Sequence, residues 1–103
     1  MIATTPSTPY YAVIFTSVKN QETPGYEEMA ALMLKLAQQQ DGFLGYESAR
    51  EEIGITVSYW SSLEAIKRWK ENSEHKIAQK LGYEHWYTSY KTRICLVERD
   101  YPV

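Results

Sequence analysis

Four short runs of β-branched and aromatic residues stand apart from two longer stretches with helical periodicity. The runs are Tyr10–Val18, Phe43–Arg50, Ile55–Trp60 and Tyr87–Glu98, and each of them predicts a β-strand. Residues 51–54 form the expected turn between the second and third strands, which therefore make a hairpin.

The first helical stretch has apolar residues three and four positions apart, which is typical of a helix with one buried side. We expect Thr23 to cap this helix, Pro24 to occupy its first position, and Asp41-Gly42 to follow its end near Gln40. The predicted buried side consists of Tyr26, Met29, Ala30, Met33, Leu36 and Ala37.

The second helical stretch begins with a Ser-x-x-Glu capping box formed by Ser61 and Glu64. Asn72-Ser73 is expected to break or kink this helix before a short second piece that Gly82 ends. The apolar residues expected on its buried side are Leu63, Ile66 and Trp69, and the second piece holds His75, Ala78 and Leu81.

The order strand, helix, strand, strand, helix, strand is the split βαβ pattern (βαββαβ) of a ferredoxin-like α+β fold with an antiparallel sheet. An antiparallel sheet with one wet face normally alternates apolar and polar residues. The first strand instead has Tyr11, Val13 and Phe15 on one side and Tyr10, Ala12, Ile14 and Val18 on the other. A second copy of the chain is the simplest cover for the extra apolar side, so we expect a homodimer.

Length and composition narrow the class of protein. The chain has 103 residues, of which 44% are hydrophobic and 23% charged, which predicts one globular domain at residues 10–103 after a flexible arm at residues 1–9. The net charge of −2, without a block of like charge, argues against a partner that is a nucleic acid or a membrane surface. No signal peptide and no membrane-spanning run is recognisable.

The reactive side chains exclude other classes of site. The single cysteine, Cys95, can form neither an intramolecular disulfide nor a Cys-based zinc site, and a reduced, cytoplasmic location is expected. His75 and His85 do not have the spacing of metal ligands, and we expect His85 to make a structural hydrogen bond. The chain contains no nucleophile elbow, phosphate-binding loop or dinucleotide motif, which disfavours hydrolases, kinases and nicotinamide-dependent enzymes.

Short motifs follow one another in a characteristic order from about Tyr10 to Tyr101. They are Gly42-Phe43-Leu44-Gly45, Glu47-Ser48, Ser58-Tyr59-Trp60, Glu64-Ala65, Trp69, Glu74-His75, Gly82, Trp86-Tyr87, Tyr90 and Val97-Glu98-Arg99. This set resembles the antibiotic biosynthesis monooxygenase family of small dimeric α+β-barrel proteins, which includes anthrone and quinol oxygenases and haem-degrading monooxygenases. The resemblance implies a dimeric α+β barrel.

The branches of this family imply different roles for the same positions. In the haem-degrading branch a Trp at the position of Trp69 helps to ruffle the haem, a His ten residues later ligates the iron, and an Asn on the first strand assists. Here the ligand position is Gln79, and the first strand has no Asn, although His75 could approach the same cavity from a different turn. In the anthrone-oxygenase branch the Trp is again present, and the position of His75 holds a proton-handling Tyr.

His75 and Trp69 are therefore the candidate catalytic residues. An imidazole that titrates near neutral pH suits a base that removes a phenolic proton, and the alternative is a surface or capping histidine. Trp69 is either a pocket wall or simply part of the core. The candidate substrate-binding residues, which are large and apolar and could equally serve packing, are Phe15, Met33, Trp60, Trp86 and Tyr87.

The leading functional prediction is a cofactor-independent monooxygenase that acts on a planar phenolic or quinol-type small molecule, without a metal. Two alternatives stay open. One is a haem-binding or haem-degrading monooxygenase. The other is a non-catalytic dimer that binds a small aromatic molecule.

Overall fold

The predicted order of elements is confirmed by a computed structural model, which describes residues 1–79 and 86–103, with side chains for residues 1–74 and 86–103. The elements are β1 (Tyr10–Lys19), α1 (Tyr26–Gln38), β2 (Phe43–Arg50), β3 (Gly54–Trp60), α2 (Leu63–Gln79) and β4 (Tyr87–Val97). The fold is α+β and ferredoxin-like, as the sequence predicts.

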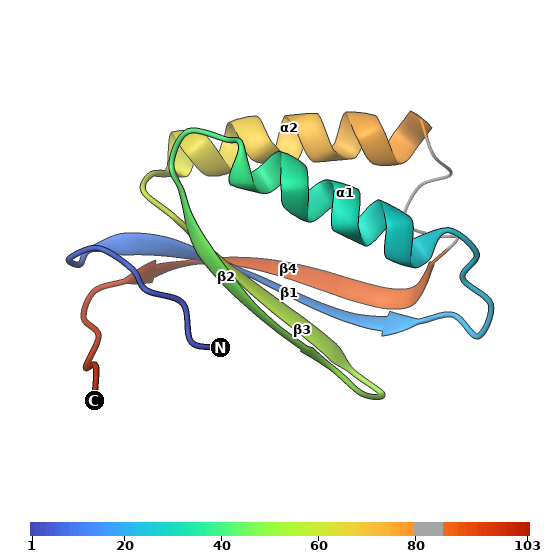
Figure 1. The fold of residues 1–103 in the computed structure, drawn as a ribbon, viewed down its shortest axis with the longest axis horizontal. Helices are drawn as coiled ribbons and strands as arrows, with labels where there is room; N and C mark the ends of the chain where they lie inside the picture. The colour runs from blue at the N-terminus through green and yellow to red at the C-terminus, as the bar shows by residue number, and fades with distance from the viewer. Residues whose placement is uncertain (80–85) are drawn as a thin grey trace.

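The strands form one antiparallel sheet in the order β2-β3-β1-β4, and both helices lie on the same side of it (Figure 1). Because paired residues on neighbouring antiparallel strands point to the same face, the register defines two sides. The helix side carries Tyr11, Val13, Phe15 and Ser17 of β1 with Trp60, Ser58, Thr56 and Gly54 of β3. The outer side carries Tyr10, Ala12, Ile14 and Thr16 of β1 with Tyr59, Val57 and Ile55 of β3.

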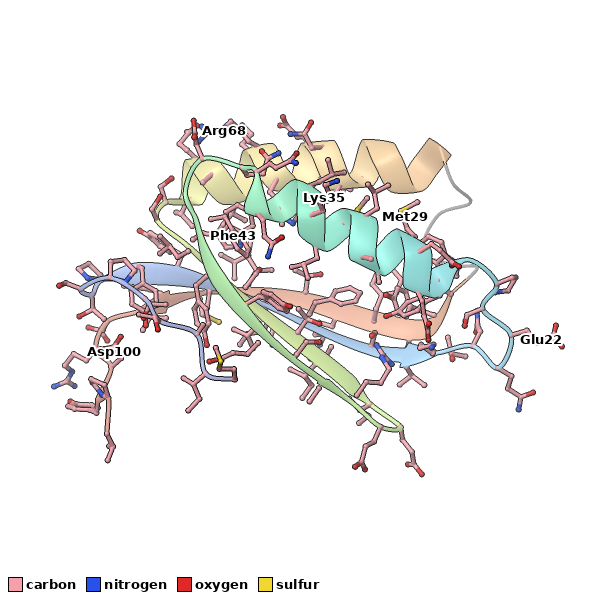
Figure 2. All side chains as sticks on the ribbon, in the orientation of Figure 1. Glu22, Met29, Lys35, Phe43, Arg68 and Asp100 are labelled. Atoms are coloured by element: carbon pink, nitrogen blue, oxygen red, sulfur yellow. The ribbon has the colours of Figure 1, made fainter. Side chains whose placement is uncertain are left out.

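The core lies between the helices and the helix side of the sheet. Figure 2 shows Phe43 and Met29 toward opposite ends of this layer of side chains. The fully buried Trp60 packs there with Ala37 of α1 and with Ala65 and Ile66 of α2. Burial of these side chains holds both helices against the sheet.

Helix α1 begins later than the sequence predicts. Its N-cap is Gly25, which has a left-handed backbone (φ 79°) and no side-chain capping hydrogen bond, so the prediction of a Thr23 cap is wrong. Thr23 instead accepts a hydrogen bond on its carbonyl oxygen from the backbone N–H of Tyr26, at 3.1 Å. The turn at Pro24-Gly25 delays the helix, because glycine adopts this left-handed conformation without steric cost. Ala30, expected on the buried side, is exposed.

Helix α2 differs from its prediction in three respects. The cap is Ser62, whose hydroxyl accepts a hydrogen bond from the N–H of Ala65 at 3.1 Å, and not the neighbouring Ser61. Leu63 is 54% exposed, because it lies at the first turn, away from the sheet. The helix does not break at Ser73, since the hydroxyl of that residue donates to the carbonyl of Lys70 and is satisfied inside the helix. Leu81, Gly82 and His85, like the side chain of Ala78, lie outside the described residues.

The N-terminal arm makes specific contacts with the sheet. The backbone N–H of Ala3 donates to Glu47 Oε2 at 2.9 Å, and the hydroxyl of Thr5 donates to that of Tyr10 at 3.0 Å. Tyr10 in turn donates to Asp100 at 2.7 Å, which links the arm to the C-terminal tail. In the part of the chain that the structure describes, neither helix has the length and apolar character needed to cross a membrane.

Candidate functional site

One aromatic cluster on the helix side is built around Trp60. The ring of Trp69 stacks on Trp60 with centroids 6.1 Å apart and planes 23° apart, and Phe43 meets Trp60 edge-on at 5.3 Å. The indole Nε1 of Trp60 donates to Ser58 Oγ at 2.9 Å, so its only polar atom is satisfied. We call Trp60, Trp69 and Phe43 the Trp60 cluster.

A second aromatic cluster lies where α1 begins and β4 begins. Trp86 and Met29 are buried, and Tyr26, Met33 and Tyr87 pack against them. The hydroxyl of Tyr87 donates to that of Tyr26 at 3.2 Å. We call these five residues the Trp86 cluster.

Phe15 joins the Trp86 cluster to the sheet. Its ring lies 5.4 Å from that of Tyr87 and 6.0 Å from that of Tyr90. Phe15 projects from the middle of β1 toward the helices, so these rings form an aromatic surface that continues from the cluster onto the sheet. Large flat surfaces of this kind suit a planar ring system.

Trp86 carries an unsatisfied donor. The residue is 4% exposed, and its indole Nε1 has no hydrogen-bond partner in the part of the chain that the structure describes. A buried N–H without a partner costs about 1–3 kcal/mol of stability, so such groups are rare and call for an explanation. The two buried tryptophans therefore differ, because the N–H of Trp60 is paired and that of Trp86 has no partner among the residues described.

Hydroxyl groups lie on the helix side between the two clusters. Ser58 accepts the hydrogen bond from Trp60, and the hydroxyls of Thr56 and Ser48 lie 2.9 Å apart. Ser58 and Thr56 are alternate residues of β3, and they lie opposite Val13 and Phe15 of β1, respectively. The surface between the clusters is thus polar but uncharged.

The structure groups the residues that the sequence singled out, and their functional roles stay predictions. Trp69 and Trp60 are in contact, whereas Met33, Trp86 and Tyr87 belong to the second cluster. His75 lies near the end of α2, and its side chain is outside the described residues. Sequence reasoning missed Phe43 and Tyr26 as site residues, although Phe43 lies in a recognised motif and Tyr26 on the predicted buried side of the first helix.

A separate cavity of about 470 Å³ lies between the arm and the edge strand β2. Residues 1–4 line it together with Phe43, Tyr46 and Glu47. Phe43 is thus shared by this cavity and the Trp60 cluster. None of the site residues predicted from the sequence is among those that line the cavity.

Glu47 and Tyr59 form a hydrogen-bonded pair on the outer side of the sheet, where the hydroxyl of Tyr59 donates to Glu47 Oε1 at 2.6 Å. This hydrogen bond and the one from Ala3 lower the pKa of Glu47. Burial, together with the bond to the Glu47 carboxylate, raises the pKa of Tyr59 to about 12. The pair therefore stabilises the fold across neutral pH, with the carboxyl ionised and the phenol protonated.

Candidate metal ligands do not gather in the described part of the chain, where no group of three or more His, Cys, Asp or Glu side chains could hold an ion. Cys95 is a free, half-buried thiol on β4.

Comparison with known proteins identifies the family. Residues 9–81 match the antibiotic biosynthesis monooxygenase family. The chain belongs to this family. It is 50% identical over 101 residues to protein YqjZ of Bacillus subtilis (strain 168), itself described as uncharacterized, with 96% of this chain and 89% of YqjZ covered.

Solved structures show the same fold at low sequence identity. SnoaB, a cofactor-independent oxygenase from Streptomyces nogalater, is similar with a TM-score of 0.68 at 11% identity, over 93% of this chain and 98% of SnoaB. PA3566 from Pseudomonas aeruginosa is similar with a TM-score of 0.69 at 17% identity, over 93% and 99% of the two chains. At these identities the similarity establishes the fold of the antibiotic biosynthesis monooxygenase family, and the chemistry must come from this chain's own residues.

Proposed function

We propose that this member of the antibiotic biosynthesis monooxygenase family is a cofactor-independent monooxygenase of a planar phenolic or quinol-type molecule, bound on the helix side of the sheet. A base removes a proton from the substrate, and the resulting anion passes electrons to O₂. One oxygen atom enters the product, and the other leaves as water with hydrogens that the substrate supplies. The cofactor-independent activity that SnoaB carries on the same fold supports this proposal.

The observation that carries the proposal is the N–H of Trp86, which lies inside an aromatic cluster and has no partner among the described residues. A planar ligand with an oxygen substituent would give this donor an acceptor, and its ring would contact Phe15 and Tyr87. The gain on binding is then specific to oxygenated aromatic molecules, because a hydrocarbon would leave the indole N–H unsatisfied. A phenol or quinol is the simplest ligand of that description.

The proposed roles of the remaining residues follow from their positions. Trp69 and Trp60 form a stacked wall at the far end of the layer, and Met33 adds a flexible apolar contact in the Trp86 cluster. His75 is the proposed base, six residues beyond Trp69 on α2. The protein then contributes orientation, exclusion of water and proton transfer, while the substrate supplies the electrons.

We also propose that the functional unit is a homodimer joined through the outer side of the sheet. Val18 and Ile55 on this side are 36% and 45% exposed, and they continue an apolar strip that includes Ile14 and Val57. A two-fold axis parallel to the strands would place β4 of one copy over β2 of the other. The exposed Lys91 and Arg93 of β4 would then approach the acidic Glu47 of β2, so the surface is self-complementary in charge as well as apolar.

Non-catalytic binding of a small aromatic molecule is the second candidate, and one observation favours it. Every described carboxylate except that of Glu47 belongs to an exposed residue, and Glu47 lies on the outer side. Within the described side chains the helix side therefore offers no buried carboxylate as a general base. Catalysis depends on His75, whereas binding does not.

Oxygen consumption by the purified protein tests the proposal. Wild type, after treatment with a chelator, is mixed with methyl gentisate, a neutral hydroquinone, and dissolved O₂ is followed with an electrode. We expect consumption above the spontaneous rate in wild type and a lower rate in Trp86→Phe, with Arg68→Gln, on the side of α2 away from the sheet, as the control. Binding of the hydroquinone without oxygen consumption would replace the enzyme with the non-catalytic candidate.

A further inference from the structure

Arg50 has an unusual position at the end of β2. Its side chain crosses the helix side of the sheet over Gly54 and reaches Ser17 on β1. There Nη2 donates to the Ser17 hydroxyl, and Nη1 donates to the Ser17 carbonyl at 3.4 Å. A methyl group at Gly54 would overlap the guanidinium, so this path exists only because position 54 is glycine.

The charge of Arg50 is not neutralised by the described part of the chain. The ion pairs found there join side chains of α2 to one another, and Arg50 is in neither of them. Ser17, which is 1% exposed, is a neutral partner that occupies only part of the guanidinium's N–H donors. A half-buried guanidinium that is held in place and has donors to spare is suited to bind a carboxylate through paired hydrogen bonds.

A second cation lies on the same side. Lys19 is two residues beyond Ser17 on β1, and its Nζ lies 4.3 Å from the ring centroid of Tyr26. Like Arg50, Lys19 takes part in neither of those ion pairs. The end of the helix side near the Trp86 cluster therefore carries two positive charges, while its neighbourhood is aromatic.

The aromatic surface borders these cations. Tyr90 is the register partner of Ser17 on β4, and its ring lies 6.0 Å from Phe15 and 5.9 Å from Tyr87. Arg50, which reaches across β3 from β2, and Tyr90 on β4 thus approach Ser17 from opposite sides. A flat ring resting on Phe15 would place a substituent at its edge within the reach of the guanidinium.

We propose that Arg50 binds a carboxylate at the edge of a planar aromatic ligand, so that the substrate class is a hydroxylated aromatic acid rather than a neutral quinol. This inference rests on the proposed function, because it uses the same aromatic surface. Arg50 supplies the paired donors, Ser17 fixes their orientation, and Lys19 adds a second positive charge. The specificity would come from a charged group that a neutral quinol does not have.

Binding of a matched pair of probes tests the inference without turnover. Gentisate and its methyl ester differ in one charge, and each is titrated under nitrogen into the full chain, with dissociation constants measured by calorimetry. In wild type we expect gentisate to bind at least about tenfold more tightly than methyl gentisate, as a charge-assisted bidentate contact allows. Arg50→Gln is expected to remove this preference while the affinity for the ester stays unchanged, and Arg50→Lys is expected to keep part of it.

Arg68→Gln is the matched control, because Arg68 lies on α2 on the side away from the sheet (Figure 2) and should leave both affinities unchanged. Equal affinities of wild type for the two probes would overturn the inference. So would an equal loss of both affinities in Arg50→Gln, which would mean that Arg50 only holds the hairpin to β1. Oxygen consumption with methyl gentisate distinguishes the two failures, because it persists if the monooxygenase proposal is right and Arg50 alone was misassigned.

Discussion

Two identical substitutions at the buried tryptophans should have different effects on stability. Trp60→Phe and Trp86→Phe each remove an indole N–H and part of a ring from a residue that is 0% and 4% exposed, respectively. The loss of packing is therefore similar at the two positions. The difference lies in the N–H group, which is paired with Ser58 in Trp60 and has no partner within the described part of the chain in Trp86.

The size of the difference follows from these hydrogen bonds. Trp60→Phe loses one hydrogen bond, worth about 1 kcal/mol. Trp86→Phe removes a buried donor whose lack of a partner costs about 1–3 kcal/mol. We therefore expect Trp60→Phe to be less stable than Trp86→Phe by about 2 kcal/mol or more, which corresponds to roughly 8–16 °C in Tm for a domain of this length.

Urea unfolding of the two variants and wild type, at one protein concentration and without ligand, measures this difference. The concentration is held fixed because dimer formation would also contribute to the apparent stability. Equal destabilisation of the two variants would refute the reasoning, since it would mean that the N–H of Trp86 finds a partner in the free protein. A larger loss in Trp86→Phe would refute it more strongly.

Four other predictions concern the base, the outer side of the sheet, the dimer and haem. His75→Ala should lower quinol turnover by about 10²–10⁴-fold and leave thermal unfolding nearly unchanged. Part of the activity should return at higher pH, because the substrate then ionises without a base. Unchanged turnover would remove His75 as the base. Tyr59→Phe should destabilise the fold by about 1–2 kcal/mol at pH 7 in urea unfolding. Because the pKa of Glu47 is lowered from 4.5, this loss should shrink as the pH falls through that lowered value, and a loss independent of pH would contradict the role of the pair. Light scattering of wild type should give twice the chain mass of 12.0 kDa, and Ile55→Lys should give a smaller mass. Leu63→Lys is the control, because Leu63 is exposed on α2, and it should keep the mass of the dimer. A monomeric wild type would exclude the dimer. Titration with haem should not give a sharp Soret band that depends on His75. A sharp band in wild type that disappears in His75→Ala would favour the haem-degrading alternative.

The sequence was a good guide to the strands and a weaker one to the ends of the helices. Alternation along β1 correctly places Tyr11, Val13 and Phe15 on one side, because the side-chain period of a strand is fixed. Helical periodicity marks a stripe of apolar residues on each helix, and it therefore predicts that Ala30 and Leu63 are buried. Both are exposed, because the sheet covers only part of each stripe. Ser61 and Ser62 are adjacent and equally suited to cap a helix, and the choice depends on where the preceding strand ends.

The candidate site was predictable in its residue types and only partly in its contacts. The sequence left Trp60 and Trp69 open between packing in the core and lining a pocket, and the structure adds that their rings stack. Hydrogen bonding of Trp86 depends on neighbours that are distant in the sequence, so no local pattern reveals an unpaired N–H. The contact of Arg50 with Ser17 depends on the register of three strands and on the absence of a side chain at Gly54, and the sequence gives no signal for it.

Turnover in isotopically labelled O₂ tests the proposed monooxygenase activity most directly. The protein is incubated with methyl gentisate and, separately, with gentisate, and the product is analysed by mass spectrometry. We expect one labelled oxygen atom in each product molecule, label in the water released, and loss of incorporation in His75→Ala. A product without label, or consumption of O₂ that ends entirely as hydrogen peroxide, would contradict the assignment of this protein as a monooxygenase.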